Sequence, residues 1–371
     1  MMNLVPDEEL TEVGDLARSI GAELLAPAAR DAERAGAVPD DVWRKLFETG
    51  LAVPVPEEHG GGGVPDPMTM LTVVENLAHG DPAIALAAYW NGAGALLLAE
   101  HGSTEQHQHL AALATQPERR TAVALHEGFG RGAAELATTV QVDGDHLRLV
   151  GTKRAVPFAS DAELVLVVAT DPDAGALRVV VVPAGAAGVT VVPDSGRLAL
   201  DAVRAADVDF DVELPASALL GGAEAPADVE VLVQRLRLWA AAAALGTAQR
   251  AIEYAAEYAT GRIAFGQPIG AFQGVSFPLA EASMRIEAAR LELVGAVLAL
   301  DERPATEHDD LVSLAASYAY GVGTQSTRDA VQTLGGHGFI KDHPVELWYR
   351  SAAAMAALDT DPARAPFSAR L

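Results

Sequence analysis

The chain has 371 residues, of which 50% are hydrophobic and 21% charged, so it has the composition of a globular protein with a sizeable core. Lys and Arg number 26 against 51 Asp and Glu, and the net charge of −25 argues against nucleic acid or an anionic membrane as a partner. The chain has no cysteine, which excludes disulfides and thiolate chemistry and fits a cytoplasmic location.

The N-terminal region has the apolar spacing of helices. Its acidic start lacks the apolar segment of a signal peptide. Apolar residues recur at helical spacing from Leu10 to Leu24. Asp40 or Asp41 is then expected to cap a short helix that ends before Gly50.

A second helical stretch is predicted from Met68 to about Leu113, with a break at Gly80-Asp81-Pro82. It contains the most apolar part of the chain, Ala83 to Ala99. Asn91 and two glycines interrupt that part, so we do not expect it to span a membrane.

The middle of the chain has the periodicity of strands. Valine-rich runs are predicted to be strands at 164–169, 177–182 and 189–192, and Asp143-Gly144-Asp145 predicts a hairpin between two earlier runs. Val208, Phe210 and Val212 alternate with acidic residues, as in a half-buried strand. No helical pattern separates these strands, so an antiparallel barrel or sandwich is predicted.

The C-terminal region returns to helices, expected over 229–260, 272–300, 311–333 and 345–358. Pro278 is expected to kink the second of them or to mark a later start. The predicted fold class is therefore α+β. It comprises an N-terminal helical domain (1–119), a middle antiparallel β-barrel or sandwich domain (120–222) and a C-terminal four-helix bundle (223–371).

Some motifs that suggest dinucleotide or metal binding have the wrong context. Gly128-Phe129-Gly130-Arg131-Gly132 follows an apolar run but precedes a hairpin, whereas a dinucleotide-binding fold needs a helix there. His107 and His109 are two residues apart, a spacing that does not suit a metal pair on a helix, and no metal site is predicted. His126 ends the first strand of the β region, where a ligand can lie.

Two glycine-rich connectors between the last helices are better candidates for a ligand site. Arg262 in the first connector suits a pyrophosphate, because a guanidinium binds two oxygens at once. The second connector is Gln332-Thr-Leu-Gly335-Gly336-His-Gly338-Phe339, and its backbone N–H groups suit a phosphate or a carbonyl oxygen. These residues alone leave open a solvated arginine and a plain turn between helices.

Taken together, these segments resemble the acyl-CoA dehydrogenase family of flavoproteins over nearly the whole chain. The strongest matches are Arg262-Ile-Ala-Phe265-Gly266-Gln-Pro-Ile-Gly-Ala-Phe272-Gln273 and the second connector, followed at family spacing by Pro344-Val345-Glu346 and Tyr349-Arg350. The resemblance implies the three-domain fold, FAD, an acyl-CoA thioester as substrate, a tetramer, and an electron acceptor such as a flavoprotein. It also implies a place in fatty acid or steroid side-chain catabolism.

The resemblance implies that one half of an FAD site is intact. The family holds the adenosine and pyrophosphate end of FAD with residues of a neighbouring subunit. The matching positions here, which we expect to bind the cofactor, are Arg262, Phe265, Gln273, Gln332, Gly335 and Gly336.

The positions that hold the flavin ring within one subunit differ from the family pattern. The family has Thr-Glu-Pro-Gly-Ala-Gly-Ser-Asp where this chain has residues 126–133, so His126 replaces a flavin-binding hydroxyl. It has Trp-x-Thr where this chain has Ala155-Val156-Pro157, and proline offers no backbone N–H. His126 remains a candidate flavin contact and Arg131 a candidate substrate contact. Arg131, Lys153 and Arg154 are candidates by charge for the thioester phosphates.

The catalytic base also departs from the family. Asp359 falls where the family has a glutamate, and is one methylene shorter. The shorter side chain displaces the carboxylate by roughly an ångström, and such a displacement of the base can lower the rate on the order of a hundredfold. The family's alternative base position falls on Leu236, which cannot act as a base. The adjacent Arg237 matches a family arginine near the active site and is a candidate substrate contact.

This asymmetry leads to three hypotheses. In the first, the chain is one subunit of a hetero-oligomeric acyl-CoA dehydrogenase, and a homologous partner seats the flavin ring and supplies the base. In the second, it is a divergent homotetrameric dehydrogenase that uses Asp359. In the third, it is a non-catalytic binding or scaffold protein.

Overall fold

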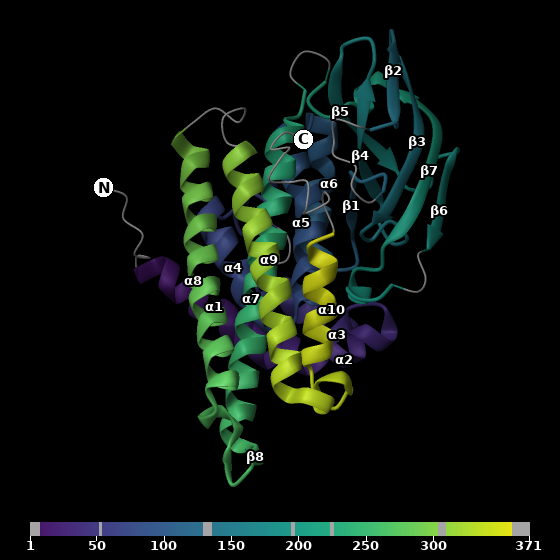
Figure 1. Cartoon of the computed structure of the whole chain (residues 1–371). Coiled ribbons are helices and arrows are strands. Elements are labelled where there is room, and N and C mark those ends of the chain that lie inside the picture. Colours follow the sequence, from purple (N-terminus) through teal and green to yellow (C-terminus); the bar gives the residue numbers. More distant parts are fainter. Residues whose placement is uncertain are drawn as a thin grey trace.

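The computed structural model describes residues 8–51, 54–128, 136–193, 197–222, 226–302 and 309–357. A long helical bundle lies on one side of the molecule and a curled sheet on the other, with α5 (Pro82–His101) and α6 (Thr104–Thr115) between them (Figure 1). The predicted order of helical, β and helical regions is confirmed. The domain boundaries remain a prediction.

The N-terminal helices begin and end at recognisable signals. Asp66 and Asp81 each accept backbone N–H groups at the start of a helix, so the predicted break at Gly80-Asp81-Pro82 is confirmed. Ser103 and Gln106 form a capping box. The predicted cap at Asp40 or Asp41 is wrong, because Pro39 is the capping residue and both aspartates lie in the first turn. The other elements are α1 (Glu8–Ile20), a π-helical turn (Gly21–Leu25), α2 (Ala26–Ala35), α3 (Asp40–Glu48) and α4 (Pro67–Gly80).

Helix α5 is the centre of the hydrophobic core. It is the one helix in the described part of the chain that is long and apolar enough to cross a membrane, yet 83% of its most apolar window is buried inside the protein. It packs against α4, against the first strand of the sheet and against the C-terminal bundle. Its apolar composition therefore reflects burial among the other elements.

The described sheet has seven strands in the order β1-β4-β2-β3-β7-β6, with β5 also paired to β4. Most pairs are antiparallel, as predicted, but β1 runs parallel to β4 over Thr121–Ala124. Parallel neighbours need a long connection, and the intervening β2–β3 hairpin supplies it here. The strands are β1 (Thr121–Ala124), β2 (Thr139–Asp143), β3 (His146–Val156), β4 (Leu164–Asp171), β5 (Ala176–Pro183), β6 (Val189–Pro193) and β7 (Ala206–Pro215).

The C-terminal bundle contains the helices that the sequence predicts. The second one starts at Gln273, so Pro278 lies inside it and a later start is wrong. A two-stranded hairpin within the first connector was not predicted. The elements are α7 (Val229–Gly261), β8 (Ile263–Ala264), β9 (Gln267–Pro268), α8 (Gln273–Glu302), α9 (Asp309–Leu334), a 3₁₀ segment η8 (Gly335–Phe339) and α10 (Val345–Met355).

The bundle and the N-terminal helices are joined by a close helix crossing. Gly246 of α7 lies so near α4 that a Cβ there would be 1.9 Å from the backbone oxygen of Glu75. The carboxylate of Glu75 pairs with Arg290 of α8 at 2.7 Å. Only glycine allows the two backbones to approach this closely.

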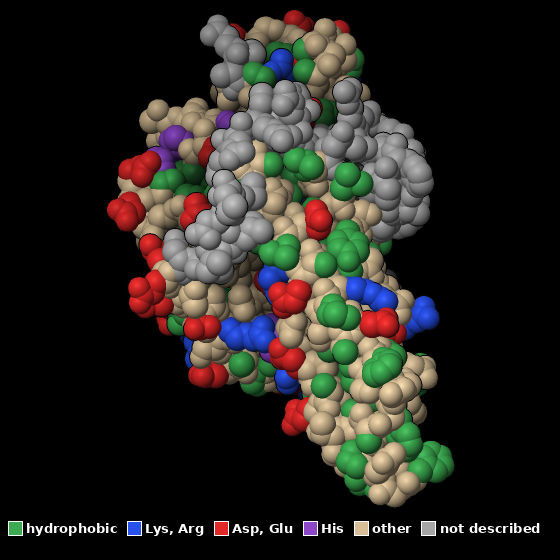
Figure 2. All heavy atoms as spheres, turned by 60° about the vertical axis from the view of Figure 1, so that its left-hand side comes forward, with side chains coloured by type: hydrophobic (Ala, Val, Ile, Leu, Met, Phe, Trp, Pro, Cys, Tyr) green, Lys and Arg blue, Asp and Glu red, His purple; other side chains and the backbone are tan. Residues whose placement is uncertain are grey.

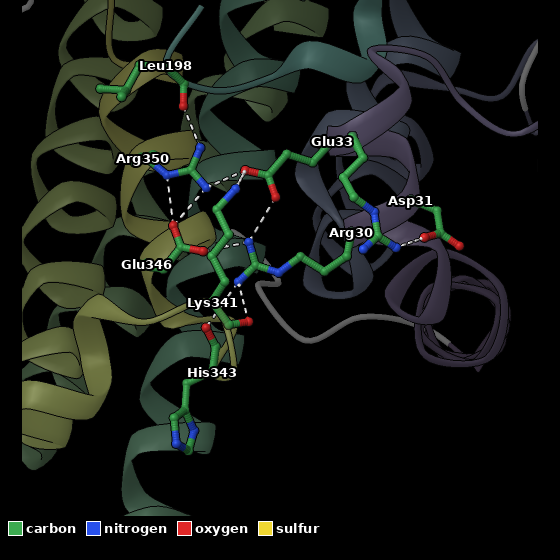
Figure 3. Close-up of polar contacts among 9 residues, drawn as sticks. Arg30, Asp31, Glu33, Leu198, Lys341, His343, Glu346 and Arg350 are labelled. Carbon is green, nitrogen blue, oxygen red and sulfur yellow. Dashed lines mark hydrogen bonds and ion pairs between the residues drawn. The ribbon is translucent and has the colours of Figure 1, made fainter.

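A charged cluster ties α2 to α10 (Figure 3). Glu33 of α2 accepts from Arg350 at 2.7 Å and from Arg30 at 2.9 Å, and Arg350 also binds Glu346 at 2.7 Å. Burial would raise the pKa of Glu33, but the hydrogen bonds from Arg30 and Arg350 outweigh it and lower that pKa to about 2. The cluster therefore needs Glu33 to be ionised.

We expect stability to fall with acid because of this cluster. The pKa of Glu33 is about 2 in the folded protein against an ordinary value of 4.5. Its contribution is fully present above pH 4.5 and is lost as the pH falls toward 2. Thermal unfolding followed by circular dichroism should show a smaller loss of melting temperature over this pH range in Glu33→Gln than in the unmodified chain. Glu58→Gln, at an exposed position, should leave the pH dependence unchanged. If the melting temperature fell equally with pH in Glu33→Gln and in the unmodified chain, the acid sensitivity would not come from Glu33.

Candidate functional site

A cavity of about 200 Å³ lies where the sheet meets the helices, and we call it the junction cavity. Strand β1 and the following Leu125 divide the two cores there, because Ala122 and Ala124 belong to the sheet core while Val123 and Leu125 pack in the core with the helices. Trp90 of α5 and Leu236 of α7 close the helical side. The full set of described lining residues is Trp90, Val123, Leu125, His126, Gly128, Arg154, Ala155, Pro157, Leu236 and Ala357.

An irregularity in β3 forms the other wall of the junction cavity. The register with β7 shifts between Lys153 and Val156, and Ala155 takes a φ of +51°. The amide of Arg154 donates to the carbonyl of His126 at 2.8 Å, which joins β3 to the segment after β1. The structure thus brings together His126 and Pro157, which lie 31 positions apart in the sequence.

A buried ion pair holds this wall in place. Lys153 is fully buried, and its Nζ donates at 2.9 Å both to the carbonyl of Leu125 and to the carboxylate of Glu127. Glu127 also accepts from the amides of Ala137 at 2.6 Å and Thr138 at 2.8 Å. Glu127 therefore joins the segment that follows β1 to the residues just before β2 and to β3.

Both members of the pair are charged at neutral pH. Burial would raise the pKa of Glu127, but hydrogen bonds from Thr138 and Ala137 and the charge of Lys153 lower it to about 2. Burial lowers the pKa of Lys153 to about 8, against the opposing effect of Glu127. The interpretation of Lys153 as a contact for thioester phosphates is therefore wrong, because its ammonium group does not reach solvent. Sequence reasoning missed the pair, whose only signal is a lysine facing inward on a strand.

A second cavity, of about 660 Å³, lies at the end of the helical bundle, and we call it the bundle-end cavity. It brings together the two glycine-rich connectors, since Arg262 and His337 both line it. The hydroxyl of Tyr258 is 2.8 Å from Nδ1 of His337, and that of Tyr254 is 2.8 Å from Nδ1 of His343. The described lining residues are Tyr254, Glu257, Tyr258, Thr260, Gly261, Arg262, His337 and His343.

The predicted FAD-tail residues are accessible at this end of the molecule. Arg262, Gln273 and Gln332 are exposed, and the side chain of Arg262 makes no hydrogen bond or ion pair with a described residue. Gly335 has a φ of +58°, which explains a glycine there, and the adjoining Gly336 is exposed. Phe265 is 97% exposed. An exposed guanidinium without a partner among the described residues, on so acidic a chain, is suited to an anionic ligand.

Arg237 lies elsewhere than the sequence suggests. Its side chain is buried between α7 and α9 and donates to the hydroxyl of Ser313 at 3.0 Å. It is not among the side chains that line the junction cavity, whereas its neighbour Leu236 is. A substrate contact by Arg237 therefore has no support from this arrangement.

Two other candidates, Asp359 and Arg131, lie outside the described residues. Ala357, two positions before Asp359, lines the junction cavity.

Within the described ranges, no group of three or more His, Asp or Glu is placed to hold a metal ion. His107 packs its ring against His59 at a centroid distance of 4.5 Å.

Comparison with known proteins gives one consistent result. Family models for the N-terminal, middle and C-terminal domains of acyl-CoA dehydrogenases match residues 7–116, 125–212 and 229–359. A probable acyl-CoA dehydrogenase of Mycobacterium tuberculosis, FadE25, is 31% identical over 93% of this chain and 90% of its own length. The short-chain specific mitochondrial acyl-CoA dehydrogenase of Bos taurus is 32% identical over 90% of this chain and 82% of its own length. The structure of butyryl-CoA dehydrogenase from Megasphaera elsdenii superposes with a TM-score of 0.85 and 26% identity, covering 98% of this chain and 97% of that one.

Proposed function

Because this chain belongs to the acyl-CoA dehydrogenase family, we propose that it is one of two unlike subunits of an FAD-dependent acyl-CoA dehydrogenase. A homologous partner would seat the flavin ring and supply the catalytic base, while this chain would hold the ADP end of the partner's FAD. The activity is α,β-dehydrogenation of an acyl-CoA thioester, as in the family. The contrast between the two cavities carries the proposal.

The bundle-end cavity has the properties of a site for the nucleotide end of FAD. At about 660 Å³ it is within the usual size range of ligand pockets, roughly 300–1,000 Å³. The guanidinium of Arg262, which has no partner among the described residues, suits a pyrophosphate, and Gly335 and Gly336 leave backbone accessible nearby. The residues present therefore fit this part of the cofactor.

The junction cavity fits a flavin ring poorly. The ring has several carbonyl and nitrogen acceptors that need donors. Of the described lining residues, only Trp90, His126 and Arg154 carry polar side-chain groups. The guanidinium of Arg154 is already paired with Asp207 at 2.6 Å, and Pro157 has no N–H to donate. Because so few donors line the junction cavity, we infer that the flavin ring lies in the partner subunit.

Exposed apolar residues around the bundle end support a covering subunit. Phe265 and Phe339 from the two connectors are 97% and 77% exposed, and Phe277 and Met284 continue the apolar surface along α8. Hydrophobic side chains gather over this projecting end of the molecule (Figure 2). Surfaces of this kind mark protein–protein contacts, with aromatic residues and Met enriched in them.

Each part of the assembly has a distinct task in this proposal. When bound, FAD supplies the redox chemistry that accepts the β-hydrogen as hydride. Arg262 would neutralise the pyrophosphate and fix the position of the cofactor tail, while the base of the partner would take the α-proton. We further propose a flavoprotein as the electron acceptor of the complex.

Of two substitutions in this chain, one should impair the purified complex and the other should leave its activity nearly unchanged. Arg262→Ala should weaken FAD binding by about 10- to 100-fold, because a charge-assisted contact contributes roughly 1.5–3 kcal/mol. Asp359→Asn should leave turnover within about twofold, because the partner supplies the base. Flavin fluorescence after ultrafiltration and a steady-state assay with an artificial electron acceptor measure the two effects.

The same variants separate the alternatives. If the lone chain is yellow and active, and Asp359→Asn abolishes that activity, the chain is a self-sufficient homotetrameric dehydrogenase and the proposal is wrong. If neither the chain nor any complex with a homologous dehydrogenase subunit binds FAD, the chain is a non-catalytic binding or scaffold protein.

A further inference from the structure

We propose that His337 and His343 are anion-binding residues of the bundle-end cavity. When protonated, they hold a diphosphate together with Arg262, and the chain takes up protons as the diphosphate binds. This inference rests on the proposed function, because the diphosphate is then the pyrophosphate of the partner's FAD. It adds two ligand-binding residues and a dependence on pH to that function.

Each of the two histidines is held by a tyrosine of α7. Tyr254 and Tyr258 are four residues apart, so their side chains lie on one face of the helix. Their hydroxyls are 2.8 Å from Nδ1 of His343 and of His337, respectively. The ring of Tyr258 also packs edge-on against His343 at a centroid distance of 5.8 Å, and the two imidazole rings are 5.7 Å apart. The four rings therefore form one cluster, and all four residues line the cavity.

Protonation of a histidine changes what its tyrosine–histidine pair can donate. A neutral imidazole has one N–H group and an imidazolium has two. When both ring nitrogens carry protons, Nδ1 donates to the tyrosine oxygen, and the hydroxyl hydrogen becomes available to a ligand in the cavity. Nε2–H is a second donor, and the charge of the ring strengthens a hydrogen bond to an anion. Each protonated pair thus offers a diphosphate two donors and one positive charge.

The other charged side chains of the cavity lining cancel, so the histidines determine its net charge. Among the described lining residues, Glu257 and Arg262 carry opposite charges. Two imidazolium rings 5.7 Å apart repel each other, and an anion bound beside them relieves this repulsion. Binding of a diphosphate and uptake of protons therefore favour each other.

The groups around the two pairs are of types that keep their charge between pH 6 and pH 8, whereas histidine ordinarily titrates near this range. Burial raises the pKa of Tyr254, so its hydroxyl stays protonated. Arg30 donates to the carbonyl of His343 at 3.1 Å and stays charged (Figure 3). The titratable and charged groups on the neighbouring elements are Arg30 of α2, Arg250, Tyr254, Glu257 and Tyr258 of α7, Arg262 of the first connector, Asp329 of α9, and Lys341, Asp342 and Glu346 from the segment after η8.

The test uses the purified full chain without flavin, and ADP-ribose as the probe. The pyrophosphate diester of ADP-ribose keeps its two charges in this range, whereas the terminal phosphate of ADP titrates near pH 6. Isothermal titration calorimetry should show binding at least about tenfold tighter at pH 6 than at pH 8. The measured enthalpy should depend on the buffer, because protons are taken up. Adenosine, which has no phosphate, should not bind more tightly at pH 6.

Glutamine at both histidine positions separates charge from hydrogen bonding. His337→Gln combined with His343→Gln keeps polar groups beside both tyrosines but cannot be protonated in this range, so it should remove the pH difference and the proton uptake. His109→Gln, at an exposed position of α6, is the matched control and should retain both. Arg262→Ala should weaken binding at both pH values and keep the ratio between them.

The outcomes separate this inference from the proposed function. Equal binding of ADP-ribose at pH 6 and pH 8, or a pH difference that survives in the double variant, would overturn the inference and leave the hetero-oligomer standing. A chain that binds no ADP-ribose at either pH would also overturn it. If the lone chain carries one FAD per chain, the proposed function fails, and the same pH comparison made on the release of FAD still tests the two histidines.

Discussion

Lys153→Met is expected to destabilise the protein by about 3 kcal/mol or more, because removing one partner of a buried ion pair leaves an uncompensated charge. The side chains of Lys153 and Glu127 are 0% and 4% exposed, and the pair is 2.9 Å apart. Methionine has a similar length, so the change removes the charge and largely retains the volume. Denaturant unfolding followed by circular dichroism measures the loss.

The matched control for this prediction lies on the same strand. Arg148 pairs with Asp211 at 2.9 Å, but those side chains are 55% and 66% exposed. Water and salt screen exposed pairs, so Arg148→Met should have little effect on stability. Replacing both buried partners, as in Glu127→Gln with Lys153→Met, should recover part of the stability. Equal losses for Lys153→Met and Arg148→Met would show that the buried pair is unimportant.

Gly246→Ala should also cost several kcal/mol. A Cβ at this position would lie 1.9 Å from the oxygen and 2.9 Å from the carbonyl carbon of Glu75, and 3.1 Å from the amide nitrogen of His79. All three atoms belong to the backbone of α4, so the whole helix must move. Overpacking typically costs about 1–3 kcal/mol, and this contact lies at the severe end.

Gly295→Ala in α8 is the matched control for Gly246→Ala. Its Cβ would meet no atom within 4 Å, so alanine should stabilise that helix by up to about 1 kcal/mol. The two glycine-to-alanine changes are therefore expected to have opposite signs in thermal unfolding. A melting temperature for Gly246→Ala at or above that of the unmodified chain would contradict the close crossing of α4 and α7.

Most of the fold follows from local patterns in the sequence. Helical periodicity, the Gly80-Asp81-Pro82 break and the Asp143-Gly144-Asp145 hairpin depend on neighbouring residues, and the structure confirms them. The parallel pairing of β1 with β4 was missed, because it depends on which strands meet after a long connection. The cap at Pro39 was missed because Asp40 and Asp41 are preferred caps by residue type.

The candidate site was less predictable than the fold. The two connectors could be singled out because glycines and Arg262 have local meaning, and the structure places them around one cavity. The burial of Lys153 and Arg237 could not be predicted, since a charged side chain is ordinarily expected at the surface. The junction cavity depends on contacts among α5, β1, β3 and α7, which no local pattern encodes.

The ratio of FAD to protein chains in the purified native complex tests the shared site most directly. Absorbance of the released flavin and amino-acid analysis give this ratio without an activity assay. We predict about one FAD for every two chains, one of them this chain and the other a homologous dehydrogenase subunit. One FAD for every chain, with this chain as the only subunit present, would contradict the account.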